Sequence, residues 1–223
     1  MKFSIYLTVV LATLIGAIGC KHPTEPSVAA ATVSFSYQIL PIIESNCGLR
    51  TCHDAKTHEH NLVLSSYSAI RELVVPRDTI ASSLYLRSTA TLSGARMPPS
   101  PRPKLTPLQL ELIKNWIMQG AENTPDTASL CDTLSLTYAK NIFPIFEVHC
   151  LGCHNSFDKG GFFDVTNFDH IKGYAEDGTL RGVIEHGAAY EAMPRNADTL
   201  GPMITRCDQL KIEKWIRDGI QHN

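Results

Sequence analysis

The chain has 223 residues, of which 43% are hydrophobic and 19% are charged. This composition is typical of one or two globular domains and excludes an intrinsically disordered chain. The formal net charge of −2 and the lack of a basic run argue against bulk attraction to nucleic acid or anionic lipid.

The N-terminal segment is expected to direct export. Lys2 is followed by an uncharged, mostly apolar run up to Cys20. This run is shorter than the roughly 18 apolar residues that indicate a spanning helix, so a plain transmembrane anchor is the weaker alternative. Ala17-Ile18-Gly19-Cys20 resembles the lipobox of bacterial lipoprotein signals. We therefore expect a signal peptide over 1–19, a lipidated Cys20 and tether over 20–33, and a place on the periplasmic side of the bacterial cell envelope.

The first segment that can carry chemistry is Cys47-Gly48-Leu49-Arg50-Thr51-Cys52-His53. It holds two thiols five positions apart and an imidazole directly after the second. Positions five apart do not share a helix face, so the residues after Cys47 must loop out. A disulfide between Cys47 and Cys52 is the alternative. His58 and His60 lie shortly after this segment. A solvated loop is the favoured interpretation, although either histidine could bind a metal ion or replace Met97 as a ligand of it.

A predicted helix runs from Thr106 to Gly120. Gln109 stands three residues after Thr106, and Pro107 suits the first helical position, which together make a capping-box start. Gly120 is suited to end the helix. Leu108, Leu112 and Trp116 stand four positions apart and, with Ile113 and Ile117 beside them, form one apolar stripe along the helix. An earlier helix contains Pro41, which predicts a kink or a first turn. No segment shows strand alternation, so the expected fold class is all-α.

The second half of the chain repeats the first about one hundred residues later. The matched segments are Ile39–Glu44 with Ile142–Glu147, Ser66–Ile70 with Asn167–Ile171, Arg96–Pro98 with Ala192–Pro194, and Ile113–Ile117 with Ile212–Ile216. Their order is the same in both halves, so chance similarity is a poor explanation. We expect two domains, over 34–123 and 131–223, joined by a turn-like linker at 123–127.

The second Cys-His segment is Cys150-Leu151-Gly152-Cys153-His154, the Cys-x-x-Cys-His pattern of c-type haem attachment. On a helical turn these three side chains share one face, so two thiols can add to the vinyl groups of one porphyrin while the imidazole faces the iron. A zinc knuckle would need two further ligands, and a thiol redox pair leaves His154 unexplained. The first segment occupies the matching place, so we predict two covalently bound haem c groups.

Each half also offers a second axial ligand. Met97 and Met193 both precede a proline, which biases the backbone to an extended form and fixes the side-chain direction. A thioether opposite a histidine raises the reduction potential, whereas the alternative role for Met is to fill gaps in a core. The predicted iron-binding pairs are His53 with Met97 and His154 with Met193, with His186 as a weaker competitor for the second iron.

Both halves resemble cytochrome c domains, particularly those of exported planctomycete and Bacteroidetes proteins. The resemblance lies in the Cys-His segments, the Met-Pro loops and the final Trp-containing helices, and it covers nearly all of the predicted mature chain. It implies two tandem helical domains, in each of which the first and last helices cross over the haem. The longer spacing in the first Cys-His segment departs from the family pattern.

Two of the seven cysteines remain once lipid and haem are assigned, namely Cys131 and Cys207. We predict that they form a disulfide, because an exported protein is in an oxidising compartment. Each is expected to precede a terminal helix of the second half. Leu108 stands in the first half where Cys207 stands in the second, so the bond would be specific to one domain.

The expected function is that of a membrane-anchored electron carrier that docks redox partner proteins and binds no nucleic acid. We assign no catalytic residue. A dihaem peroxidase is an alternative, but it needs an iron with an open or displaceable distal site, and each haem here has a candidate methionine. A haem-based redox sensor is a further alternative that the sequence does not separate from a carrier.

Overall fold

The computed structural model describes residues 32–92, 94–125, 131–158, 162–194 and 204–223. Across these ranges the chain is helical and contains no β-strand, which confirms the predicted all-α class. The predicted signal peptide and Cys20 lie outside the described residues. Among the residues described, no helix has both the length and the apolar character that crossing a membrane requires.

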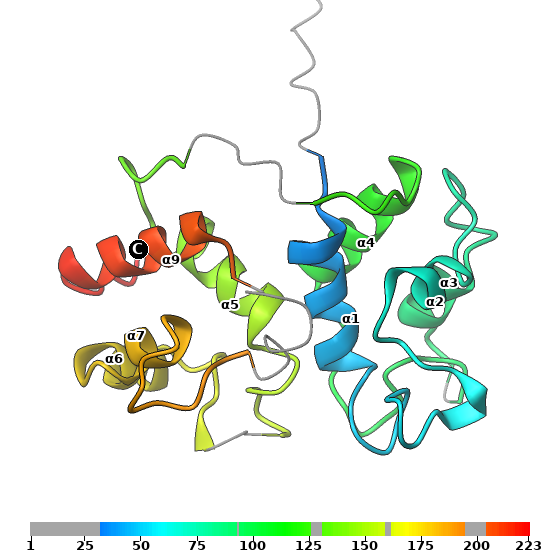
Figure 1. Cartoon of the computed structure of the whole chain (residues 1–223), viewed down its shortest axis with the longest axis horizontal. Helices are drawn as coiled ribbons and strands as arrows, with labels where there is room; N and C mark the ends of the chain where they lie inside the picture. Colours follow the sequence, from blue (N-terminus) through cyan, green and yellow to red (C-terminus); the bar gives the residue numbers. More distant parts are fainter. Residues whose placement is uncertain (1–31, 93, 126–130, 159–161, 195–203) are drawn as a thin grey trace, which may run out of the picture. The chain divides into compact units, whose positions relative to one another are not determined.

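Apart from η2 in the first half, the described helical elements follow one another in the same order in both halves of the chain (Figure 1). The first half contains η1 (Phe35–Ile39), α1 (Leu40–Asn46), η2 (Glu59–Asn61), α2 (Tyr67–Arg71), α3 (Ser83–Thr89) and α4 (Pro107–Met118). The second half contains η3 (Tyr138–Ile142), α5 (Phe143–His149), α6 (Phe168–Glu176), α7 (Thr179–Ile184) and α9 (Arg206–Arg217).

Each half begins with a π-helical turn that continues into a short α-helix. The side chains of Ser34 and Thr137 cap these two turns by accepting backbone hydrogen bonds of 3.2 and 3.3 Å. Pro41 and Pro144 lie in the first turn of α1 and α5. A first-turn proline sacrifices no intrahelical bond, because the N–H there has no partner within the helix. The prolines therefore mark a first turn, one of the two predicted outcomes.

The last helix of the first half begins and ends as the sequence predicts, and the last helix of the second half begins with a matching cap. Thr106 and Gln109 form both hydrogen bonds of a capping box at the start of α4. Gly120 follows α4 with a φ of +108°, which a residue with a side chain would adopt only with strain. In the second half, Thr205 caps α9 by accepting a bond of 3.0 Å from the amide of Asp208.

A separate hydrophobic core lies in each half, built around three aromatic rings. The matched trios are Phe35, Tyr67 and Trp116 in the first half and Tyr138, Phe168 and Trp215 in the second. The edge-to-face pair has its centroids 5.0 Å apart in both halves, and the pair that includes Trp is separated by 5.5 and 5.6 Å. The sequence repeat thus produces the same packing twice.

The end of each half returns to its own first turn. The amide of Phe35 donates to Oγ1 of Thr124 at 3.0 Å, and the amide of Tyr138 donates to Oδ1 of Asn223 at 2.8 Å. The turn η1 also packs against α4, and η3 packs against α9. The first and last helical elements of each half therefore lie against each other.

Cys131 and Cys207 form a disulfide with their Cα atoms 5.4 Å apart, which is the predicted pairing. Cys207 lies in the first turn of α9 rather than before the helix, because Thr205 and not a later residue caps it. The bond links the segment before η3 to the last helix across a separation of 76 residues.

Removing this disulfide is expected to destabilise the second half. Chain-entropy theory gives an upper value of about 4 to 5 kcal/mol for a loop of this length. The Cys131→Ser/Cys207→Ser variant should therefore unfold at a lower urea concentration than the native protein, and a thiol reductant should lower the native midpoint but not that of the variant. Identical native midpoints with and without reductant would show that the bond contributes nothing.

Candidate functional site

The two Cys-His segments leave the same place in the fold, the C-terminal end of the first α-helix in each half. Cys47 is the C-cap of α1, and its amide donates to the carbonyl of Ile43 at 2.7 Å. Cys150 is the C-cap of α5, and its amide donates to Phe146 at 2.9 Å. The first thiol of each segment is therefore anchored by a helix end.

The histidines return to the first cysteine despite the different spacing. The amide of His53 donates to the carbonyl of Cys47 at 3.2 Å, and that of His154 donates to Cys150 at 2.9 Å. The two additional residues of the first segment form a loop, in which Thr51 adopts a left-handed φ of +71°. The looping predicted for this segment is thus observed, and it restores the same contact between histidine and cysteine.

The chain after each histidine is held in the same way. The carbonyl of His53 accepts a bond from Leu64, and that of His154 accepts one from Val165, both at 2.9 Å. The next residue, Asp54 or Asn155, uses its side-chain oxygen to accept backbone hydrogen bonds from residues two or three positions later. An Asp or Asn directly after each histidine is the sequence signal for this local turn. The Cys-His pattern alone does not include this residue.

None of the four cysteines in the two segments forms a disulfide, so the alternative of a bond between Cys47 and Cys52 is wrong. Burial raises the pKa of Cys47 to about 12, and the neighbouring Cys52 adds to the shift. Burial likewise raises the pKa of Cys150 to about 12, with a smaller effect from Cys153. Cys47 is buried and Cys150 is partly buried, and with these raised pKa values both thiols stay protonated near neutral pH.

The imidazole of His53 is oriented by a backbone carbonyl. Its Nδ1 lies 3.1 Å from the carbonyl oxygen of Glu59, so an Nδ1–H tautomer donates this bond and leaves the lone pair on Nε2. Metal-binding histidines are commonly oriented in this manner. His58 and His60 are exposed and have left-handed backbones, in agreement with the favoured prediction of a solvated loop.

The imidazole of His154 has an aromatic environment instead. Its ring centroid lies 5.3 Å from that of Phe163, which packs at 4.8 Å on Tyr174. The neighbouring His149 is buried, and burial lowers its pKa to about 4, so it is neutral at physiological pH. The two halves therefore share a backbone frame but differ in what surrounds the candidate proximal histidine.

The two Met-Pro loops are fixed by matching backbone hydrogen bonds. The amide of Met97 donates to Arg87 in α3 at 2.9 Å, and that of Met193 donates to Val183 in α7 at 3.0 Å. Both methionines are partly buried. These bonds hold the two methionines at matching places in the repeat, and their pairing with His53 and His154 on iron stays a prediction. His186 adopts a left-handed φ of +56° and is exposed.

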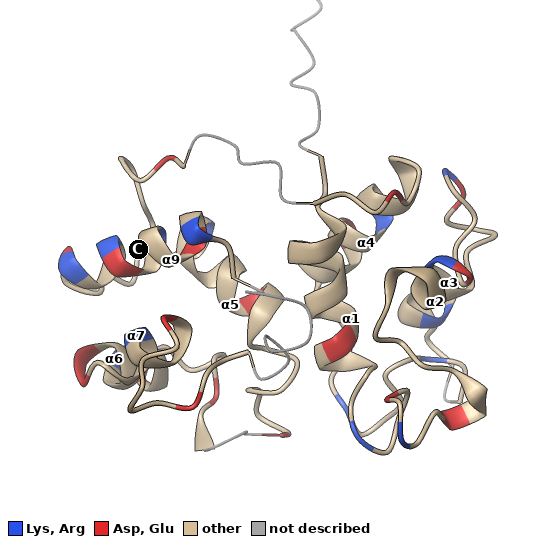
Figure 2. Cartoon of the chain, viewed as in Figure 1, with Lys and Arg blue, Asp and Glu red and all other residues tan. Residues whose placement is uncertain are grey.

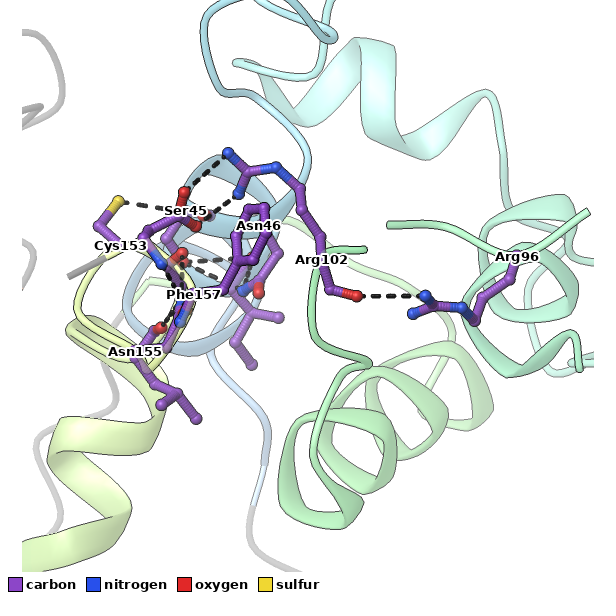
Figure 3. Close-up of polar contacts among 11 residues, drawn as sticks. Ser45, Asn46, Arg96, Arg102, Cys153, Asn155 and Phe157 are labelled. Atoms are coloured by element: carbon purple, nitrogen blue, oxygen red, sulfur yellow. Dashed lines mark hydrogen bonds and ion pairs between the residues drawn. The ribbon is translucent and has the colours of Figure 1, made fainter. Parts of the chain in front are cut away.

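The second Cys-His segment lies against α1, which itself packs against α5. Ser45 of α1 lies against Gly152, where an added Cβ would come within 2.6 Å of the Ser45 carbonyl oxygen. The Sγ atom of Cys153 is 4.0 Å from the same carbonyl (Figure 3). The second Cys-His segment therefore touches the helix that ends in the first Cys-His segment, a contact that no sequence pattern predicts.

A buried amide makes a second contact at this junction. Gln109, which is 1% exposed, donates from Nε2 to the carbonyl of Glu147 in α5 at 2.8 Å. The same side chain also closes the capping box of α4. Val148 of α5 completes the junction by packing in the core of the first half.

Within the described ranges, no group of three or more His, Cys, Asp or Glu side chains is arranged to hold a metal ion. No protein-family model matches this chain, and neither a curated protein nor a solved structure is significantly similar to it.

Gly152→Ala is expected to destabilise the protein by about 1–3 kcal/mol, because the added methyl group would meet the backbone of Ser45, which cannot rotate away. Gly173→Ala in α6 is the matched control, since nothing lies within 4 Å of its added Cβ. It should stabilise the protein by about 0.5–1 kcal/mol through helix propensity. Urea unfolding measures both. A similar effect of the two substitutions would disprove the close approach at Gly152.

Proposed function

We propose that this chain is a c-type cytochrome that carries two covalently bound haem c groups and transfers electrons. The observation that supports the proposal most strongly is the equivalence of the two Cys-His segments. Each begins at a helix C-cap, keeps its two cysteines out of disulfides, and returns its histidine amide to the first cysteine carbonyl. Two thiols followed directly by an imidazole are the donor set that haem attachment requires.

The residues have distinct roles in this proposal. Cys47 and Cys52 would form the thioethers of the first haem, and Cys150 and Cys153 those of the second. The bound group would supply an iron that alternates between the ferric and ferrous states. His53 supports the assignment because its Nδ1 bond to a carbonyl directs Nε2 outward as a ligand.

Met97 and Met193 are the proposed distal ligands. The backbone amide of each methionine forms the hydrogen bond that ties its loop to a helix of the same half. A thioether would favour the ferrous state and would leave no vacant site for peroxide or oxygen. This argument favours a carrier over a peroxidase.

The junction of α1 with α5 supports electron exchange between the two halves. Cys153 lies beside Ser45, two residues before Cys47. Two groups attached at these segments would be neighbours, so an electron entering one half would have a short route to the other.

Protein partners would meet a surface of mixed charge. The helix α9 carries both signs, and its charges pair with one another, as in Lys214 with Asp218 at 2.6 Å and Arg206 with Glu213 at 3.0 Å (Figure 2). A helix without a dominant sign of charge, in a chain of formal net charge −2, is poorly suited to bind a polyanion such as nucleic acid.

The expected stoichiometry is two haems for each chain, measured as pyridine haemochrome against protein concentration. Cys47→Ala/Cys52→Ala should retain one haem, and so should Cys150→Ala/Cys153→Ala, because each pair of thioethers holds one group. Cys131→Ser/Cys207→Ser is the control and should retain both. A native ratio of one, lost only with the Cys150/Cys153 variant, would show that the first segment holds no haem.

Absorption spectra of the same haem-loaded protein distinguish an electron carrier from a peroxidase and from a sensor. A carrier should be low-spin with the weak red charge-transfer band of iron–methionine bonding, and Met97→Ala or Met193→Ala should each open one iron to added ligands. A native high-spin haem with peroxide turnover would instead favour the peroxidase. A spectrum that responds to a small ligand with no electron exchange would favour the sensor.

We also propose that the protein is held to the membrane by a lipid on Cys20. The uncharged run before this residue and the lipobox-like Ala17-Ile18-Gly19 support the proposal. Cys20→Ser should release the protein from washed membranes or leave the precursor uncleaved. A mature N-terminus at any other residue, determined by mass spectrometry, would rule out this anchor.

A further inference from the structure

A partly buried ion pair joins the two halves. Nη1 and Nη2 of Arg102 donate to the two carboxylate oxygens of Asp158 at 2.7 and 3.1 Å (Figure 3). Both side chains are 24% exposed, and the guanidinium lies 5.9 Å from the ring centroid of Phe157. A bidentate geometry fixes direction as well as distance, unlike most surface ion pairs.

On the first side, this pair is tied to the loop that carries Met97. Nη2 of Arg96 donates to the carbonyl of Arg102 at 3.1 Å, and the amide of Arg102 donates to Pro99 at 3.0 Å. The loop between contains three prolines, at 98, 99 and 101. Because proline fixes φ, a loop of this composition has little backbone freedom. The position of Arg102 therefore restricts the position of Met97.

On the second side, the pair is tied to the second Cys-His segment. The amide of Asp158 donates to Oδ1 of Asn155 at 3.0 Å. Nδ2 of Asn155 donates in turn to the carbonyls of Leu151 and Gly152 at 2.9 and 3.2 Å. Those two residues lie between Cys150 and Cys153. A continuous series of hydrogen bonds therefore runs from the segment of one proposed haem to the ligand loop of the other.

The arrangement is one-sided. Ala192 stands in the second Met-Pro loop where Arg96 stands in the first. The side-chain bond that closes the first loop therefore has no counterpart at that position of the second.

We infer that Arg102 and Asp158 are positioning residues that hold Met97 on the first iron, so that the second half of the chain maintains the axial ligation of the first. The inference rests on the proposed dihaem function. In this arrangement the ion pair does more than hold the two halves together. It links the methionine ligand of one proposed haem to the Cys-His segment of the other.

The test uses the holoprotein and follows the red iron–methionine band as pH is raised. Met97→Ala identifies the contribution of the first haem. In Asp158→Asn and in Arg102→Gln, the part of the band that belongs to the first haem should disappear at a pH about one unit lower than in the native protein. This difference corresponds to a tenfold shift in the ligand-exchange equilibrium. The contribution of the second haem should not move, although Asp158 lies in the second half. The double variant should show no more than the effect of either single change.

Arg181→Gln is the control, because Arg181 forms its ion pair at 2.8 Å with Glu185, the C-cap of its own helix α7 in the second half. It should leave both contributions unchanged. Should Asp158→Asn fail to fold, Asp158→Glu keeps the charge but lengthens the side chain, and it should give a smaller shift in the same direction.

Two results would overturn the inference: no shift in the first haem, or an equal shift in both haems, which would indicate a general loss of stability. The haem-to-protein ratio is measured on the same samples. A native protein without two covalent haems would instead refute the proposed function.

Discussion

The close packing of α1 on α5 is the contact on which the arrangement of the candidate sites depends. It requires a glycine at position 152, since the backbone of Ser45 occupies the space that a side chain would take. Both helices end directly in a cysteine, so whatever fixes the helices also fixes the start of the two Cys-His segments. The junction is therefore a constraint on the chemistry as well as on the fold.

The internal repeat supplies a common frame, and the departures from it are what distinguish the halves. The bonds from histidine to cysteine and from methionine to the preceding helix occur in both halves. By contrast, His53 is oriented by a carbonyl whereas His154 packs on Phe163. Hydrogen bonding and burial both tune haem potentials, so two haems in these sites would not be equivalent. In the proposed carrier, this difference would give electron flow through the chain a preferred direction.

Local patterns predicted the local structure well, whereas the contacts between halves were missed. The capping box at Thr106 and the first-turn place of Pro41 depend on neighbouring residues alone, and both are present. Gln109 was assigned a capping role only, yet its amide also reaches α5. Arg102 and Asp158 are 56 positions apart, and nothing in the sequence around either one names its partner. Such contacts depend on how the helices of the two halves pack against each other, so no periodic signal in the sequence encodes them.

In the first Cys-His segment, by contrast, the structure is closer to the pattern of the second half than the spacing of its residues suggests. Counting residues suggested a departure from the attachment pattern, because positions five apart do not share a helix face. The left-handed turn at Thr51 absorbs the additional residues and returns His53 to Cys47. The feature that the two halves share is thus a hydrogen bond between backbone groups and not a number of residues. A search for further segments of this kind should therefore require a cysteine at a helix end and a cysteine-histidine pair that can fold back onto it.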